Sequence, residues 1–316
     1  MAMLAPTAVE AEAPGGEVLS DAQVSEVLFA ALEQAVTGQR TLVLVPDRTR
    51  NLPLSRLFPL VSEALHRAKS VEVMVALGTH PPLPESEIYD LLGVSGRPDV
   101  GLPGVANHAW ADPSALASLG SVPEERLRQI AGPVWHDSLG GDLLVRINKR
   151  ALEVDRVVIV GPTLPHEVAG FSGGAKYLFP GISGPEMIDK MHWLGALSGV
   201  LATIGYKETP VRALIDEAAL LVPAPVSLVA LVTDSSGDGD QIAGVYAGDP
   251  SLVWEASAAQ AGLLHVSWLD RTYERVVSCP MSIYDELWTA GKAMYKLEAA
   301  VADGASSSST RQTFPV

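Results

Sequence analysis

The sequence has little of what several classes of protein require. Only one of its 316 residues is a cysteine, Cys279, which excludes an internal disulfide bond and a thiolate metal cluster and fits a reducing compartment. The 22 basic residues are outnumbered by 37 acidic ones, and the formal net charge of −15 disfavours binding to nucleic acid. No apolar run approaches the ~20 residues of a membrane-spanning helix. We therefore expect a cytoplasmic protein that binds neither nucleic acid nor membrane.

Apolar residues are plentiful, at 47% of the chain, which is enough to fill a large core. Short apolar runs predict buried strands, and they alternate with amphipathic stretches that predict helices. The predicted strands are 41–45, 71–77, 143–147, 156–160, 227–232 and 275–277, and the predicted helices are 21–35, 54–68, 185–197 and 211–221. This alternation is typical of an α/β fold with a Rossmann-like, largely parallel sheet.

Changes of composition divide the chain into a flexible leader, a large domain that carries the site, part of a second, abbreviated α/β domain, and a disordered tail. The predicted bounds are 1–18, 19–263, 264–304 and 305–316. The leader lacks the basic and apolar regions of a signal peptide. Within the large domain, residues 233–248 are rich in Asp, Gly and Ser and are interpreted as a loop or hinge. The partial second domain is expected to contain a helix over 285–302.

Two polar clusters directly follow predicted strands, at the strand ends where ligands of parallel sheets bind. Residues 47–50, with the sequence DRTR, offer a carboxylate, a hydroxyl and two guanidinium groups, which suit phosphate or carboxylate. Residues 78–80, with the sequence GTH, place His80 where it can transfer protons. Taken alone, a solvated loop and a structural histidine explain these clusters at least as well.

A third cluster, HEVAGFSGGAK over residues 166–176, has three glycines within five positions. These glycines permit close approach to a bound group and leave backbone N–H donors for an anion. A nucleoside-triphosphatase loop is excluded because Tyr177 follows Lys176 where that motif needs Ser or Thr. A fourth candidate, His192, falls in a predicted helix, where a lone histidine is usually structural. The histidines do not have the short spacings of preformed zinc motifs.

The order and spacing of these clusters resemble the lactate racemase family that uses a nickel-pincer nucleotide, over roughly residues 40–300. Residues 47–50 resemble its D-x-T-R loop, residues 78–80 its G-T-H motif, and residues 166–176 its H-x-x-x-G-F-S-G-G-x-K motif. The resemblance implies two proton acceptors, a lysine that carries the cofactor through a thioamide link, and a protein ligand to nickel. These are His80 and His166, Lys176, and His192; the implied cofactor contacts are Asp47, Arg48, Thr49, Arg50, Ser172, Gly173 and Gly174.

The implied cofactor is pyridinium-3-thioamide-5-thiocarboxylic acid mononucleotide nickel, made by separate cofactor-maturation enzymes. The implied reaction racemises or epimerises a 2-hydroxy acid: hydride leaves C2, the hydroxyl proton goes to a histidine, and hydride returns to the opposite face. Two alternatives stay open. The same cofactor can serve a hydride-transferring oxidoreductase, or the chain can be a non-catalytic cofactor-binding homologue.

The substrate-binding residues implied by the resemblance lie in the segment WTAGK, where Lys292 matches a lysine that pairs with the substrate carboxylate. Trp288 and Thr289 stand where the family commonly has Tyr and Gln, and Pro81 stands where it often has Arg. These departures leave room for a bulkier or more apolar 2-hydroxy acid than lactate. Members of the family usually continue well beyond this helix, so the second domain is expected to be incomplete here.

Overall fold

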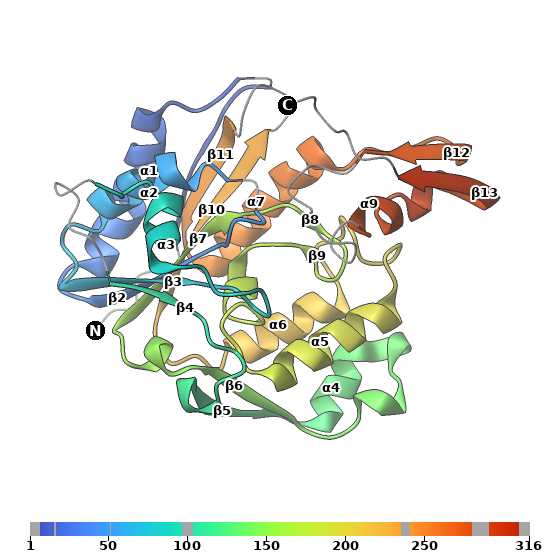
Figure 1. Cartoon of the computed structure of the whole chain (residues 1–316), viewed down its shortest axis with the longest axis horizontal. Helices are drawn as coiled ribbons and strands as arrows, with labels where there is room; N and C mark the ends of the chain where they lie inside the picture. Colours follow the sequence, from blue (N-terminus) through green and yellow to red (C-terminus); the bar gives the residue numbers. More distant parts are fainter. Residues whose placement is uncertain are drawn as a thin grey trace.

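The computed structural model of the chain describes residues 7–15, 17–50, 52–96, 104–234, 241–279 and 291–309. A seven-stranded sheet with the order β1-β11-β10-β7-β2-β3-β4 forms its centre (Figure 1). These strands are β1 (Ala8–Glu12), β2 (Arg40–Val45), β3 (Ser70–Val75), β4 (Gly104–Asn107), β7 (Arg156–Pro162), β10 (Val226–Asp234) and β11 (Gln241–Gly248). The five strands from β10 to β4 are parallel, and β11 is antiparallel to both of its neighbours. The predicted α/β fold with a largely parallel sheet is confirmed.

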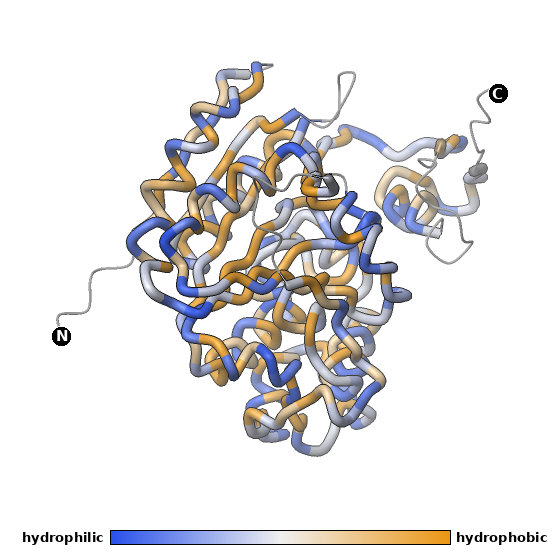
Figure 2. Tube along the Cα trace, turned by 60° about the vertical axis from the view of Figure 1, so that its left-hand side comes forward, coloured by the Kyte–Doolittle hydropathy of each residue, from blue (hydrophilic) through white to orange (hydrophobic). Residues whose placement is uncertain are grey.

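Helices cover both faces of this sheet, and the strands are apolar on both sides for that reason. In β2, Val43 and Val45 pack with helices α1 and α2, whereas Leu42 and Leu44 pack with α5 and α6 on the opposite face. The tube in Figure 2 shows these apolar segments running through the interior. The helices are α1 (Asp21–Val36), α2 (Leu54–Ala64), α3 (Glu85–Leu91), α4 (Glu124–Ala131), α5 (Pro185–Ser198), α6 (Pro210–Ala219), α7 (Pro250–His265) and α9 (Lys292–Tyr295).

Three smaller sheets each have two strands. They pair β5 (Leu116–Val122) with β6 (Leu143–Asn148), β8 (Pro165–His166) with β9 (Gly170–Phe171), and β12 (Tyr273–Ser278) with β13 (Val301–Ser309). The predicted strand at 143–147 therefore exists as β6, but it lies outside the central sheet. Among the described residues, no helix is long and apolar enough to cross a membrane.

Two predictions near the edge of the central sheet are wrong. Part of the expected flexible leader is β1, which pairs in register from Ala8 opposite Gly248 to Glu12 opposite Gly244. The expected loop at 233–248 is the end of β10 followed by β11, and only residues 235–240 between them lie outside the described residues. Backbone hydrogen bonds to neighbouring strands order both segments, and Ile242, Val245 and Ala247 of β11 pack in the core.

The C-terminal prediction also needs correction. Where a helix was expected over 285–302, the described part is the single turn α9, the 3₁₀ turn η6 (Glu298–Ala300) and then β13. This strand continues into the expected disordered tail as far as Ser309. β13 runs parallel to β12 and is ordered by that pairing. The division of the chain into domains stays a prediction.

Candidate active site

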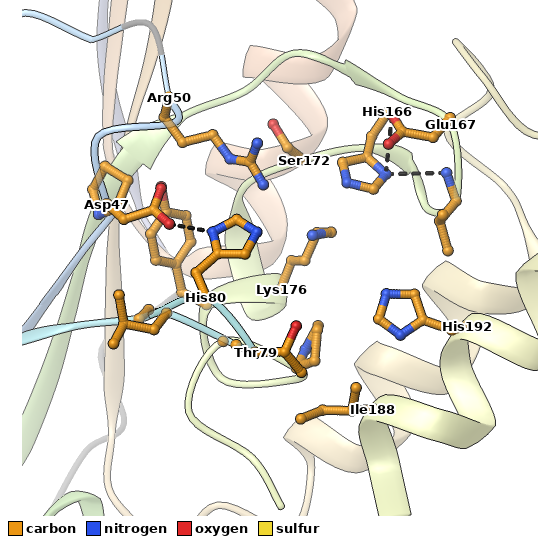
Figure 3. Close-up of a pocket in the computed structure, with 18 of the residues that line it drawn as sticks. Asp47, Arg50, Thr79, His80, His166, Glu167, Ser172, Lys176, Ile188 and His192 are labelled. Carbon is orange, nitrogen blue, oxygen red and sulfur yellow. Dashed lines mark hydrogen bonds and ion pairs between the residues drawn. The ribbon is translucent and has the colours of Figure 1, made fainter. Parts of the chain in front are cut away.

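A cavity of about 560 Å³ lies at the carboxyl ends of β2, β3 and β7, where the polar clusters of the sequence meet. Figure 3 shows Arg50, His80, His166, Lys176 and His192 directed into this one space from different elements. The loop after β2 contributes Asp47 and Arg50, and the loop after β3 contributes His80. Because these strands are parallel, their carboxyl ends lie at the same edge of the sheet, and the loops that follow them bring together residues far apart in the sequence.

His80 is held by the carboxylate of Asp47, which is only 8% exposed. Oδ1 of Asp47 accepts hydrogen bonds from the backbone N–H of Thr49 at 3.0 Å and from its hydroxyl at 2.6 Å, while Oδ2 accepts from Nδ1 of His80. Burial raises the pKa of Asp47, but the hydrogen bonds and positive charge of His80, with help from Thr49 and Arg50, outweigh it and lower the pKa to about 2. Asp47 is therefore an ionised acceptor at neutral pH.

The backbone conformation of the glycine-rich loop after β7 requires glycine at two positions, Gly170 and Gly173. Gly170 has φ 81°, and a Cβ atom there would lie 1.9 Å from the carbonyl oxygen of Tyr206. Gly173 has φ 78°, and its Cβ would lie 2.9 Å from Oγ1 of Thr163. Because left-handed backbone and missing space both exclude a side chain, these glycines fix the route of the loop past the cavity.

Arg212 and Trp254 donate hydrogen bonds to backbone carbonyl groups of the same loop, on the side away from the cavity. The guanidinium of Arg212 donates to the carbonyl of Phe171 at 2.7 Å and to that of Gly173 at 3.4 Å. The indole Nε1 of Trp254 donates to the carbonyl of Ser172 at 3.0 Å, and the guanidinium of Arg212 stacks 4.2 Å from the centre of the Trp254 ring. Three successive carbonyl groups thus face away from the cavity toward one stacked pair.

Lys176 follows in the 3₁₀ helix η5 (Gly174–Tyr177) and extends its amine into the cavity (Figure 3). Within the described part of the chain, its Nζ has no hydrogen-bond or ion-pair partner. Burial is the main cause that lowers the pKa of Lys176 to about 7, and the positive charges of Arg50, Arg212 and Lys292 add to it, whereas Glu167 opposes. A large fraction of this amine is therefore neutral and nucleophilic near pH 7.

His166 and Glu167 form the opposite wall. Nδ1 of His166 accepts hydrogen bonds from the backbone N–H groups of Val168 at 3.0 Å and Ala169 at 3.3 Å. Glu167 is 8% exposed, and its Oε1 pairs with Nζ of Lys292 at 3.0 Å. Burial raises the pKa of Glu167, but Lys292 and other favourable contacts lower it overall. This ion pair links the C-terminal segment to the cavity.

His192 lies on α5 at the exposed side of the cavity, one turn after Ile188. Burial of the ring and then the charge of Lys176 lower the pKa of His192, so the imidazole is neutral and able to bind a metal at neutral pH. Among the described residues, no group of three or more His, Cys, Asp or Glu side chains could hold a metal ion. A metal here therefore needs most of its ligands from another molecule.

Most of the residues predicted for the site line the cavity, and a few do not. Those that do are Asp47, Arg50, His80, His166, Ser172, Gly173, Lys176, His192 and Lys292. Arg48 points elsewhere and pairs with Glu87 at 3.0 Å, Thr49 supports Asp47, and Gly174 packs against Trp254 instead of lining the cavity. Trp288 and Thr289 lie outside the described residues.

Three residues of the site were missed by sequence reasoning. Glu167 stood inside a recognised motif without a role, although an acidic residue beside a candidate base was a usable signal. Arg212 and Trp254 lie on α6 and α7, far from every motif, and nothing in the sequence pointed to them.

A family model described as the lactate racemase N-terminal domain matches residues 1–135 and 136–203 of the chain. The chain belongs to this family. The match covers β2, β3, β7 and α5, and therefore every residue of the cavity described above except those contributed by the C-terminal segment.

Two curated members are similar in sequence. The lactate racemase of Lactiplantibacillus plantarum is 30% identical over 168 residues, which are 51% of this chain and 34% of that protein. The lactate racemase of Thermoanaerobacterium thermosaccharolyticum is 25% identical over 181 residues, which are 56% of this chain and 38% of that protein. The matches thus span little more than a third of the relatives' own lengths.

Two solved structures share the fold. A protein from Thermotoga maritima superposes with a TM-score of 0.82 at 26% identity, over 92% of this chain and 71% of that one. The lactate racemase apoprotein of Thermoanaerobacterium thermosaccharolyticum superposes with a TM-score of 0.70 at 20% identity, over 90% of this chain and 66% of that one. The mostly parallel α/β architecture is therefore that of the lactate racemase family.

Proposed function

We propose that the chain racemises lactate or a related 2-hydroxy acid with a nickel-pincer nucleotide attached to Lys176. The observation that carries this proposal is the amine of Lys176: it is half-buried in the cavity wall, lacks a partner among the described residues, and has its pKa lowered to about 7. An amine removed from water without a hydrogen-bond partner destabilises the folded chain, and its presence here is explained by a role in binding the cofactor. A neutral amine at the base of a cavity is suited to forming an acyl-type bond with a cofactor.

The other residues of the cavity fit such a cofactor. The neutral imidazole of His192 is available as a nickel ligand, and because no protein cluster supplies further ligands, sulfur or carbon donors of the nucleotide would have to complete the set. The guanidinium of Arg50 can pair with the phosphate of the nucleotide. Gly173 offers a wall without a side chain, and the hydroxyl of Ser172 is occupied by hydrogen bonds with Leu164 and Pro162. Arg48 faces Glu87 and is not needed.

When bound, the nucleotide supplies an acceptor for the hydride of substrate C2. The chain itself supplies the acid–base chemistry and the anchoring of the substrate. Nε2 of His80 accepts the hydroxyl proton, and the carboxylate of Asp47 stabilises the imidazolium that forms. Lys292 can bind the substrate carboxylate, with Glu167 holding its amine at the cavity wall. Burial of these groups strengthens each interaction.

The attachment is tested by producing the full chain together with the cofactor-maturation enzymes and measuring its intact mass and metal content. We expect a covalent adduct on Lys176 and nickel bound in proportion. Lys176→Arg keeps a long basic side chain but should carry no adduct, and Lys69→Arg, an exposed site, serves as the matched control. An unmodified Lys176 in a protein with full activity would overturn the proposal.

The reaction is tested by a chiral assay of the matured protein with lactate and with bulkier 2-hydroxy acids. Substrate deuterated at C2 should keep its deuterium in the inverted product, because hydride leaves and returns within one site. Net accumulation of the 2-oxo acid instead would identify an oxidoreductase.

A further inference from the structure

Ile188 is a buried apolar side chain that is not part of the hydrophobic core. It is 4% exposed, yet it belongs to neither of the two apolar clusters. Among the buried apolar residues that the structure describes, only Ala243, a small residue of β11, shares this property. The side chain of Ile188 is therefore shielded from water by the walls of the cavity and not by core packing.

Helix α5 directs this side chain toward the same space as His192. The two residues are four positions apart, so they lie on one face of the helix, about one turn from each other. Figure 3 shows Ile188 beside Thr79, and both residues line the cavity. Met187 and Met191, on another side of α5, belong to the core. The helix thus packs on the core with one face and borders the cavity with the other.

The other aliphatic side chains of the cavity wall are fixed by the core. Leu77 is a member of the cluster beneath α1 and α2, and Ala76 and Val168 pack against the cluster on the opposite face of the sheet. Many of the remaining groups of the wall are charged or polar. Among the described residues, Ile188 is therefore the aliphatic side chain of the cavity whose apolar surface is left for a bound molecule.

Racemisation requires that both ends of the substrate stay in place. Hydride leaves one face of C2 and returns to the opposite face, so the planar 2-oxo acid must turn over between the two steps. A turn about the line from C1 to C3 keeps both ends where they are and moves the oxygen of C2 from one side to the other. His80 and His166 lie on different sides of the cavity, so each can face that oxygen in one of the two positions.

The two ends of the substrate need different surroundings. The carboxylate of C1 is placed at Lys292, whose amine pairs with Glu167 at 3.0 Å. In Figure 3, Glu167 lies at the upper right and Ile188 at the bottom, with His192 between them. The side of the cavity away from Lys292 is thus the side of Ile188, and it is available for the end that carries C3.

We propose that Ile188 contacts the C3 substituent of the bound hydroxy acid and limits it to a small aliphatic group. This inference rests on the proposed function and adds to it a residue that determines specificity. The side chain of Ile188 offers dispersion contacts and no hydrogen bond. A methyl or ethyl group gains from such contacts, whereas a second carboxylate at this position loses hydration without acquiring a partner from Ile188.

The selectivity of the enzyme measures this contact. The matured full chain and its Ile188→Ala variant are compared by a chiral assay with lactate, 2-hydroxybutanoate and 2-hydroxy-3-methylbutanoate. We expect the ratio of kcat/KM for the branched acid to kcat/KM for lactate to rise at least about tenfold in Ile188→Ala, because one methylene group in an apolar pocket changes kcat/KM by ~10–200-fold. An unchanged ratio overturns the proposal.

Ile215→Ala is the matched control, because Ile215 is 0% exposed in the core and does not line the cavity. It should lower the urea midpoint more than Ile188→Ala does, and it should leave the selectivity unchanged. The adduct on Lys176 and the nickel content are measured in the same proteins. A loss of adduct or nickel in Ile188→Ala, with unchanged selectivity, would assign Ile188 to the cofactor and refute the contact with the substrate.

Binding separates this inference from the proposed function. Isothermal titration of the matured chains with pyruvate and 3-methyl-2-oxobutanoate requires no turnover. If the chain racemises none of the hydroxy acids, the proposed function fails, but a preference for pyruvate that is lost in Ile188→Ala still supports the contact. The same preference in both chains, or binding of neither 2-oxo acid, overturns it.

Discussion

Lys176 is a half-buried lysine in the wall of the cavity, and its amine loses its charge near neutral pH. Burial and neighbouring cations lower its pKa in the folded state to about 7 from the ordinary 10.5, so between these values the unfolded chain holds the proton and the folded chain does not. Stability must then rise with pH across that window, and the full penalty applies below about pH 7. In the protein without a cofactor, Lys176 therefore lowers the free energy of unfolding.

From this we predict that Lys176→Met makes the cofactor-free chain more stable at pH 7, by at least about 1 kcal/mol, since one pKa unit corresponds to ~1.4 kcal/mol. The gain should shrink as the pH approaches 10. Urea unfolding of both chains at several pH values measures it, with Lys69→Met as the exposed control. Parallel stability curves for Lys176→Met and the unaltered chain would contradict the low pKa.

Asp47 gives the opposite dependence on pH. Its folded pKa of about 2 lies below the ordinary 3.8, so its contribution is present above about pH 4 and is lost as the pH falls toward 2. We expect Asp47→Asn to lower the free energy of unfolding by about 2 kcal/mol at pH 6 and to make little difference near pH 2.

The same substitution should affect the reaction. Without an anionic acceptor, His80 loses the contact that keeps its proton on Nδ1, and we expect racemisation by the matured protein to fall at least a hundredfold, on the order found when an orienting carboxylate is made neutral. Nickel content and the adduct on Lys176 should be unchanged. A loss of the adduct would instead show that Asp47 serves the cofactor.

At the scale of elements, the strands that surround the site were predictable and the parts that support it were not. β2 and β7 are nearly continuous apolar runs, and β3 is one apart from Glu72, because helices cover both faces of the sheet. Such runs can be recognised in the sequence alone. In contrast, α7 mixes buried Val253, Ala258 and Ala261 with exposed Leu252 and Leu263, which blurs its helical pattern. Its carbonyl-binding Trp254 could not be anticipated for the same reason.

The candidate site divides in the same way. His80, His166 and Lys176 were predictable because each stands in a motif with short, fixed spacing. Glu167 and Arg212 act through contacts that depend on how separate elements pack, namely with Lys292 and with the carbonyls of the glycine loop. Arg48 was assigned because it lies within the D-x-T-R loop of residues 47–50, yet its side chain pairs with Glu87.

The support of the glycine loop by α6 and α7 yields a prediction at this scale. Arg212→Lys keeps the charge but cannot reach two carbonyl groups and cannot stack flat on Trp254, so we expect a loss of about 2 kcal/mol in stability and less adduct on Lys176. Trp254→Phe keeps the ring and loses only the bond to Ser172, and should cost about 1 kcal/mol.

Urea unfolding and intact mass together check these two variants. Arg126→Lys, in an exposed pair with Glu217, provides the matched control and should leave the free energy of unfolding unchanged within error. Variants of Arg212 and Trp254 that behave like this control would show that the loop holds its shape without them.

For the whole molecule, the described core lies entirely in the part of the chain that ends with α7. Both apolar clusters, as far as the described residues go, contain no residue beyond Ala261, whereas the segment with β12, α9 and β13 meets the cavity through Lys292. We therefore predict that a chain ending at Trp268 still folds cooperatively, as followed by circular dichroism during urea unfolding.

The buried Glu167 makes this prediction sharper. In the shortened chain it has lost Lys292, so Glu167→Gln should stabilise that chain; in the full chain it leaves Lys292 without a counter-ion, so the same change should destabilise. Both effects are expected on the order of 1–3 kcal/mol. Effects of the same sign in the two chains would show that the ion pair does not join the segment to the domain.

The place of β1 at the edge of the central sheet has a consequence for synthesis. β1 ends at Glu12, whereas its partner β11 begins only at Gln241, so β1 leaves the ribosome long before the strand it pairs with. At ~5–20 residues per second, the first strand waits on the order of ten seconds or longer. During this time the four strands β2, β3, β4 and β7 can already pair, so β1 is the last of the seven strands to join the sheet.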